Sequence, residues 1–300
     1  MSPFVHLHVH TQYSLLDGQA SINALVDKAM ADGMPGIAVT DHGNMFGIKE
    51  FFNYTNKVNG KIKDKIKGLE KELKEARETT PGDTALIAGI EEKIQSEKGR
   101  FFKPIFGCEV YVAKEDLHTH VDKRDSGRHL ILLAKNKQGY KNLIKIVSKA
   151  WTEGFYSHPR TDKKEIEAHK EGLIVCSACL GGEIPRLLAA GDYEEADRQV
   201  KWWKSVFGDD YYIELQRHKA TVTRANHETY EEQMRVEPML LKLAQENGVK
   251  VIATNDVHFV NEEDAEAHDR LICLSTGKSL EDPTRMLYSK QEWMKTQEEM

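Results

Sequence analysis

Short apolar runs alternate with longer amphipathic stretches along this chain. Runs rich in Val, Ile and aromatic residues predict seven strands, at residues 4–10, 36–42, 103–113, 129–135, 172–179, 211–216 and 249–258. Between most of them apolar residues recur at helical spacing, as in 21–33, 195–208 and 237–248. Each of these three segments ends at a glycine, as helices commonly do. Strands that alternate with helices predict an α/β fold with a parallel sheet, open or closed into a barrel.

Residues 57–100 depart from this alternation. They are dense in Lys and Glu, and their apolar positions recur at helical spacing on both sides of the turn sequence TTPGD. The recurring positions are Ile62, Ile66, Leu69, Leu73, Leu86, Ile90 and Ile94. We therefore predict an inserted αα-hairpin whose charged faces are simply solvated, with partner binding by those faces as the alternative.

Composition narrows the class of protein. The chain has 300 residues, 40% of them hydrophobic, and a formal net charge of −6, so contact with nucleic acid would need a local patch or a metal site. Four cysteines in so long a chain do not make a disulfide framework and favour a reducing compartment. With neither a signal-peptide pattern nor a run of about 18 apolar residues, we expect a cytoplasmic protein with no membrane partner.

Ligand-type side chains gather at the predicted strand ends. His6, His8 and His10 alternate in a predicted strand and so share a face, although any one of them could simply be packed against a helix. Further candidates follow or begin other strands: Asp41, His42, Glu109, His129, Cys179, Asp256 and His258. The strand ends of a parallel barrel meet at one mouth. Imidazole, carboxylate and thiolate suit zinc, manganese or iron, and so many ligands predict two or three divalent ions.

Six motifs, in chain order, carry a family resemblance: HLHVHT, SLLDG, VTDHGNMFG, FGCEVYV, CLGGEIP and ATNDVHF. Together they resemble the PHP (polymerase and histidinol phosphatase) domain, and most closely the PHP domains of bacterial DNA polymerase III alpha subunits. The resemblance implies a distorted seven-stranded (β/α)7 barrel built from residues 1–56 and 101–278, with the helical hairpin of residues 57–100 inserted. Residues 279–300 resemble the start of the polymerase palm region.

The resemblance also implies a set of metal ligands. The matching positions are His8, His10, Asp17, His42, Glu109, His129, Cys179, Asp256 and His258. Asp17 and Cys179 stand where stand-alone phosphatases of the family use histidine, which favours the polymerase branch. His6 would then support the strand, and Asp41 would either orient a histidine or cap a turn.

The implied chemistry is metal-assisted hydrolysis of a phosphoester. Glu109, bridging two ions, would act with Asp256 and His258 through a metal-activated water. The implied substrate is the 3′ end of a DNA primer, which would make the chain a proofreading 3′–5′ exonuclease domain. The alternative is a metal-stabilised structural module that docks a separate proofreading exonuclease subunit among the polymerase III holoenzyme subunits, with little catalysis of its own.

The remaining candidates are weaker. His218, after a predicted strand, and Arg160, in the loop sequence SHPRTD, could bind a substrate phosphate or belong to plain surface loops. His118 and His120 form another H-x-H pair, but in a polar segment typical of a loop. Polar surroundings predict surface positions for the other histidines, His158, His169, His227 and His268.

Overall fold

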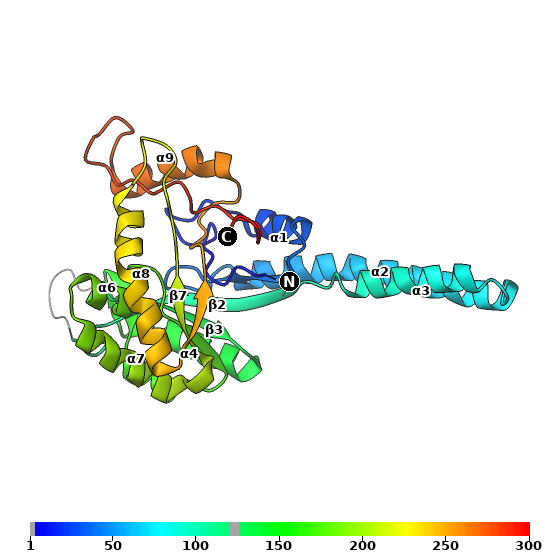
Figure 1. The fold of residues 1–300 in the computed structure, drawn as a ribbon, viewed down its shortest axis with the longest axis horizontal. Helices are drawn as coiled ribbons and strands as arrows, with labels where there is room; N and C mark the ends of the chain where they lie inside the picture. Colours follow the sequence, from blue (N-terminus) through cyan, green and yellow to red (C-terminus); the bar gives the residue numbers. More distant parts are fainter. Residues whose placement is uncertain (1–3, 120–125) are drawn as a thin grey trace.

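The computed structural model describes residues 4–119 and 126–300. Figure 1 shows a curled sheet surrounded by helices, with a long helical arm projecting from one side. The strands are β1 (Gly36–Val39), β2 (Lys103–Val112), β3 (Arg128–Ala134), β4 (Phe155–Tyr156), β5 (His158–Thr161), β6 (Leu173–Cys176), β7 (Tyr211–Leu215) and β8 (Lys250–Ala253).

The strand order in the sheet is β4-β5-β2-β3-β6-β7-β8, with β1 beside β2. β3 runs antiparallel to both β2 and β6, so the prediction of a wholly parallel sheet is wrong there. A parallel neighbour needs a long crossover, usually a helix, and the described residues between β2 and β3 contain none. Because β3 is reversed, His129 at its start lies beside Tyr111 near the end of β2.

The predicted first strand is instead an extended segment that joins the two sides of the curled sheet. On one side it meets β1, where Ala38 N donates to His6 O at 2.9 Å. On the other side it meets the chain beyond β8, where His10 N donates to Val257 O at 2.7 Å. Because its hydrogen bonds are divided between two neighbours, the described part of this segment forms only a single bridge, between Val9 and Val257.

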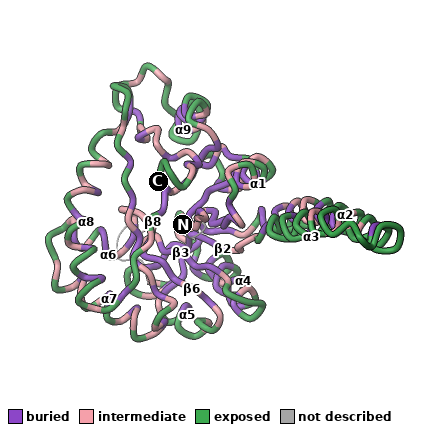
Figure 2. The backbone as a smooth tube through the Cα atoms, turned by 45° about the vertical axis from the view of Figure 1, so that its right-hand side comes forward, coloured by how far each residue is buried: buried purple, intermediate pink, exposed green. Residues whose placement is uncertain are grey.

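The helices cover the outside of the sheet, and most strand residues are buried, although β8 is largely exposed (Figure 2). They are α1 (Ile22–Ala31), α2 (Ile48–Thr79), α3 (Thr84–Lys98), α4 (Lys137–Thr152), α5 (Lys163–Ala168), α6 (Glu183–Ala189), α7 (Tyr193–Phe207), α8 (Glu228–Asn247) and α9 (Ala265–Thr276). The largest core cluster packs α4, α7 and α8 on the sheet through residues such as Leu143, Trp203 and Leu243. Within the described residues, we find no helix with the length and apolar character that a membrane crossing requires.

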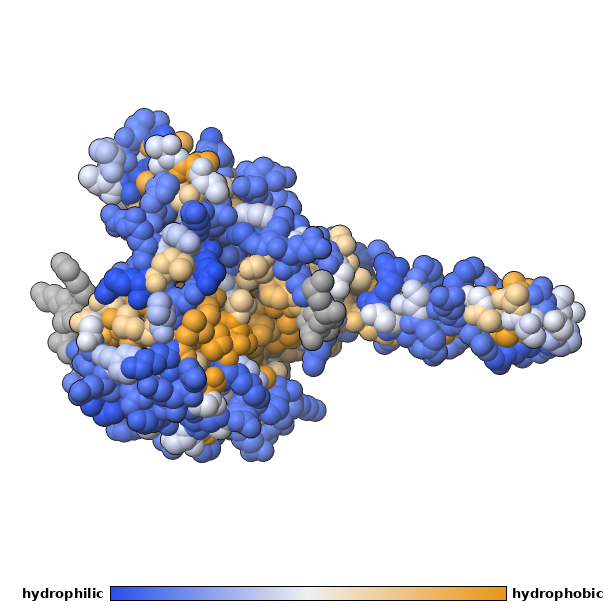
Figure 3. All heavy atoms as spheres, in the orientation of Figure 1, coloured by the Kyte–Doolittle hydropathy of each residue, from blue (hydrophilic) through white to orange (hydrophobic). Residues whose placement is uncertain are grey.

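Helices α2 and α3 form the predicted αα-hairpin, which we call the arm. Its first helix begins at Ile48, so the arm continues a barrel helix and does not start at residue 57. The buried seam contains Ile62, Ile66, Ala76, Ile90 and Ile94. Leu86, predicted for this seam, is 45% exposed, and Ile87 packs against the seam instead. The rest of the arm is mostly hydrophilic (Figure 3).

Candidate metal centre

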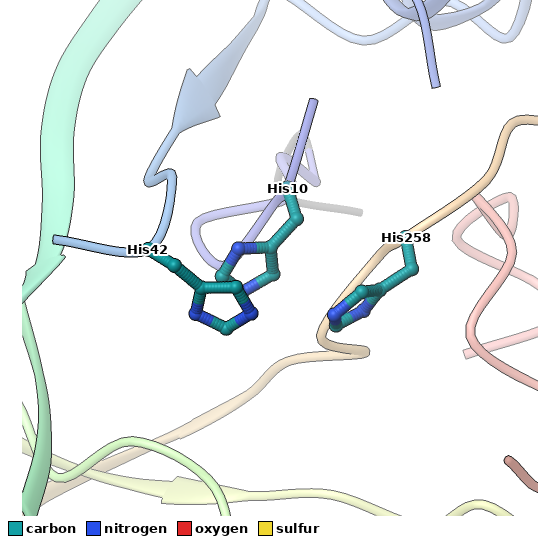
Figure 4. A group of neighbouring side chains, drawn as sticks. All are labelled: His10, His42 and His258. Carbon is teal, nitrogen blue, oxygen red and sulfur yellow. The ribbon is translucent and has the colours of Figure 1, made fainter. Parts of the chain in front are cut away.

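All nine predicted ligand positions lie close together, at one end of the curled sheet. Three of them come from separate segments: His10 from the extended N-terminal segment, His42 just after β1, and His258 beyond β8. Their rings face one another (Figure 4), with centroids 4.0 Å apart for His10 and His42 and 4.4 Å apart for His10 and His258. Asp17 joins them through its Oδ2, 2.9 Å from His42 Nε2.

Glu109 occupies the centre of this ligand cluster. Its Oε2 lies 3.0 Å from His10 Nε2 and 2.9 Å from His42 Nδ1, and its Oε1 contacts His129 Nδ1. The Sγ of Cys179 is 3.5 Å from the same His129 nitrogen. Glu109 lies within β2 and not at its end, so burial inside the curled sheet, not a strand terminus, positions this carboxylate.

Asp256 and His258 do not share a strand face as predicted, because β8 ends at Ala253. Asp256 has a φ of 48°, a left-handed conformation that Asp tolerates better than most residues. Its Oδ1 lies 3.0 Å from His8 Nε2 and 3.1 Å from His10 Nε2. Nδ1 of His258 is hydrogen-bonded to Asp256 O at 2.7 Å, which leaves Nε2 as the nitrogen available to the cluster.

Many polar atoms of the cluster are buried yet make no hydrogen bond to any residue that the structure describes. They are His8 Nε2, His10 Nε2, His42 Nδ1, His258 Nε2, Asp256 Oδ1 and both carboxylate oxygens of Glu109. Buried polar atoms without partners are costly and uncommon, and here they converge instead of pairing. The ligand atoms form three compact groups, each within 4.8 Å: His10, His42, His258; His8, His10, Asp256; and Glu109, His129, Cys179. This donor set fits divalent metal ions.

The electrostatics keep the carboxylates charged. Burial opposes the charge on Glu109, but His129 and His42 outweigh it and hold the pKa of this carboxyl well below its usual range. Asp256 is likewise buried, and His8 holds its pKa low. Burial raises the pKa of the Cys179 thiol, and a bound cation would favour its thiolate form.

A second group of residues orients the ligands, and sequence reasoning missed most of it. Glu214 in β7 accepts a hydrogen bond from His8 Nδ1 at 2.9 Å, which leaves Nε2 facing the cluster. The sequence could have pointed to Glu214, because it is an acidic residue inside the apolar run YYIELQ. Ser14 Oγ accepts from His10 Nδ1 at 2.9 Å and donates to Asp41 at 2.8 Å, so Asp41 orients His10 through Ser14.

Two further residues contact Asp17 from the C-terminal part of the chain. Tyr288 Oη donates to Asp17 Oδ1 at 2.9 Å, and burial, with the charges of Asp17 and Asp256, raises the pKa of Tyr288. His268 Nε2 lies 3.8 Å from the same oxygen. The predicted surface position of His268 is wrong, since it is 2% exposed. The signal was its helical spacing with Ile272 on the buried face of α9.

Residues 288–295 pack on the loop that carries Asp256 and His258. Glu292 O accepts from His258 N at 2.7 Å, and the Asn255 side-chain amide donates to Gln291 O at 2.8 Å. Lys295 O is 2.7 Å from His6 Nε2. His6 is therefore a buried supporting residue, as expected, and burial lowers its pKa to about 4.

The two predicted substrate-binding residues are both engaged within the protein. His218 is buried, with Nε2 donating to Asn255 O at 3.0 Å and Nδ1 2.9 Å from the Gln233 amide nitrogen. Arg160 is buried, and its guanidinium donates to Leu117 O and Thr119 O, each at 3.3 Å. His218 lines the cavity at the cluster, whereas Arg160 braces the chain after β2.

The remaining described histidines are either exposed or half-buried. His227 is exposed as predicted, His118 lies in an exposed turn that agrees with the predicted loop, and His120 lies outside the described residues. His169 is half-buried beside Glu165. His158 is half-buried and stacks on Tyr111 at 4.5 Å, so its predicted surface position is only partly right.

The cluster opens into a cavity of about 700 Å³. Its wall includes six of the nine cluster residues: Asp17, His42, His129, Cys179, Asp256 and His258. A volume of this size suits a small organic ligand or one end of a polymer. The ligand cluster therefore borders a cavity large enough to admit a substrate.

Comparisons with known proteins agree with this geometry. A family model described as the PHP domain matches residues 6–218. The DNA polymerase III subunit alpha of Borreliella burgdorferi is 41% identical over 302 residues, covering 100% of this chain and 22% of its own length. That of Treponema pallidum is 37% identical over 301 residues, covering 99% of this chain and 21% of its own. The chain therefore spans about a fifth of the length of these relatives.

Among solved structures, an amidohydrolase from Chromobacterium violaceum is 13% identical. The alignment covers 86% of this chain and 88% of that one, with a TM-score of 0.45, a likeness too distant to bear on function. The match to the PHP family model is much stronger evidence, because it spans more than half of the residues and contains seven of the nine cluster positions. The chain belongs to the PHP domain family.

Proposed function

We propose that this chain is a metal-dependent phosphoesterase domain of a DNA polymerase III alpha subunit and removes nucleotides from the 3′ end of DNA. One observation carries the proposal: buried imidazole and carboxylate atoms without hydrogen-bond partners converge beside an open cavity. The identity to polymerase III alpha subunits supports the replicative setting, with DNA and other holoenzyme subunits as partners in the cytoplasm.

In this proposal the nine cluster residues are the metal ligands, and two or three ions of zinc, manganese or iron are held. Such ions supply Lewis acidity, which neutralises phosphate charge and makes water a stronger nucleophile near neutral pH. Glu109 contributes both oxygens at the centre, and Asp256 and His258 complete the side open to the cavity. Glu214 and Ser14 hold His8 and His10 in the orientation that directs Nε2 inward.

The test is a 3′–5′ exonuclease assay on the 300-residue chain, with labelled single-stranded and mismatched primers and added manganese or zinc. Asp256→Asn removes a ligand charge while suiting the left-handed backbone at this position. Asp64→Asn, on the exposed face of the arm, is the matched control. We expect nucleotide release that is lost with Asp256→Asn and with chelator but kept with Asp64→Asn. No release from protein carrying two or three ions would contradict the proposal.

A second candidate function has its own support. Residues 288–295 are bound to the loop of Asp256 and His258, so metal in the cluster would also fix this segment. The domain would then be a metal-stabilised structural module that positions neighbouring parts of the polymerase and docks a proofreading subunit. Metal-dependent stability without nucleotide release in the same assay would favour it.

A further inference from the structure

Three large aromatic side chains stand exposed at the rim of the cavity. Phe46 is 54% exposed, Trp151 41% and Phe155 53%. They come from the loop before α2, the last turn of α4 and strand β4, so separate segments of the chain bring them together. Exposed apolar side chains gathered in one place are typical of a binding surface. We call these three residues the aromatic platform.

The platform is continuous and held in place. The ring centroids of Phe46 and Trp151 are 5.7 Å apart, and those of Trp151 and Phe155 are 5.6 Å apart with their planes at 29°. The indole Nε1 of Trp151 donates to Gly43 O at 2.8 Å, which satisfies its only polar atom. Because Gly43 directly follows His42, the indole is fixed relative to the ligand cluster.

The platform and the ligand cluster share one cavity. Phe46, Trp151 and Phe155 line it together with His42 and His129. A stacked pair, Tyr111 and His158, lies in the same wall, and the Tyr111 ring is 5.3 Å from that of His129. Aromatic surface therefore extends from the rim to the cluster.

The charges in this wall limit what the cavity can recognise. Among the described residues that line it, none is Lys or Arg. The described part of the wall therefore offers no Lys or Arg side chain for a phosphate backbone, whereas its aromatic faces offer a means of holding a polymer end. Nucleobases suit such faces, because every base has a π-surface and stacks regardless of its identity.

We propose that Phe46, Trp151 and Phe155 form a subsite on which bases of a single-stranded 3′ end stack, next to the phosphodiester at the ligand cluster. This proposal rests on the proposed function and adds the form of the substrate. A base in a duplex is already stacked and paired, so only an unpaired end can lay its bases on the platform. Selection of frayed or mismatched ends would follow from this geometry.

The experiment measures binding in the absence of hydrolysis. The Asp256→Asn chain is titrated, by fluorescence anisotropy, into a labelled single-stranded decanucleotide and into the same strand with abasic sites at its last three 3′ positions. Trp151→Leu, Phe46→Leu and Phe155→Leu keep an apolar side chain but remove the ring. Phe52→Leu is the matched control, since Phe52 is an exposed aromatic residue of α2 outside this cavity.

We expect Trp151→Leu to weaken binding of the intact strand roughly fivefold or more, from the usual worth of base stacking. The abasic strand should bind the Asp256→Asn chain at least as weakly as the intact strand binds this variant, and Phe52→Leu should change nothing. Equal binding of intact and abasic strands, or no effect of the three ring substitutions, would overturn the subsite. The subsite would also be overturned if the ring substitutions abolished association with a proofreading subunit but left DNA binding unchanged.

Failure of the subsite and failure of the proposed function give different results. If the parent chain releases nucleotides but the ring substitutions leave binding and rate unchanged, the subsite is wrong and the exonuclease stands. If binding depends on the rings but no nucleotide is released in the presence of bound metal, hydrolysis is wrong and a single-strand binding site remains.

Discussion

In the ligand cluster, carboxylates and imidazoles are buried together, whereas in the arm the charged side chains face solvent around a narrow apolar seam. Glu109 is 1% exposed and is surrounded by four histidines, while Lys71 and Glu75 on the arm are paired 3.8 Å apart at 80% and 62% side-chain exposure. A buried charge without a compensating partner is costly, but an exposed pair contributes little to stability. The cluster should therefore depend on bound cations, and the arm on its few isoleucines.

Removing metal should have the largest effect. Ions present at about 1,000 times their Kd stabilise a folded chain by about 4 kcal/mol, and for a chain of this size we expect chelation to lower Tm by roughly 10 °C. Calorimetry with and without chelator measures it. Chelation should lower the Tm of Asp256→Asn much less, and that of Asp64→Asn by the full amount. If chelation left Tm unchanged in protein shown to have carried metal, the cluster would not depend on bound cations.

Disrupting the apolar seam of the arm should have the second largest effect, and it should leave the ligand cluster intact. Ile66→Ala removes a buried side chain from a thin core and should cost about 2–3 kcal/mol locally. Hydrogen exchange across α2 and α3 should accelerate while metal content stays the same. Leu86→Ala, on the same arm but exposed, is the control and should change exchange little. Loss of metal from Ile66→Ala would mean that the arm and the cluster are coupled.

The contrast between buried and exposed charges should also appear in how the free energy of unfolding depends on pH. Burial lowers the pKa of Lys295 from 10.5 to about 8. Between these values the unfolded chain binds the extra proton, so the free energy of unfolding should rise with pH from about 8 to 10.5, by about 2–3 kcal/mol. Below pH 8 the residue is charged in both states and the full penalty applies. The difference between the parent and Lys295→Met, in denaturant titrations, should show this rise, and the exposed Lys71→Met is the control.

Tyr288→Phe should have a smaller effect that is specific to metal. It removes the hydrogen bond to Asp17, and bonds to charged groups are worth about 1.5–3 kcal/mol. We expect about tenfold weaker affinity for one ion, measured by chelator competition, together with an altered visible spectrum of the cobalt-substituted protein. Tyr54→Phe loses a hydrogen bond to the exposed Asp27 and is the matched control. Equal metal affinity in both variants would show that Tyr288 only packs.

The sequence predicted which residues meet in the cluster better than it predicted how they meet. The motifs around His8, His42 and Asp256 are local, so they could be recognised without knowing the fold. The orienting contacts are not local: Tyr288 and Asp17 are 271 positions apart, and His8 and Glu214 are 206 apart. No periodicity connects such pairs.

The same limit explains the errors in the fold. The reversal of β3 depends on what connects it to β2, and the apolar run of β3 is the same for either direction. The positive φ of Asp256 is fixed by its surroundings and leaves no mark in a pattern of alternating residues. The arm was predicted more fully because its seam repeats locally, and only its start and the exposure of Leu86 differed.

The smallest effect should come from the ion pairs of the arm. Arg77 and Glu91 join α2 to α3 with side chains 57% and 48% exposed, so Glu91→Gln should cost no more than about 0.5 kcal/mol. Salt should remove most of that difference, because exposed pairs are screened at about 8–10 Å at physiological ionic strength. Hydrogen exchange of α3 at low and high salt measures it. A cost near that of Ile66→Ala would mean that the arm, like the cluster, is held by charge, and the contrast between the two regions would fail.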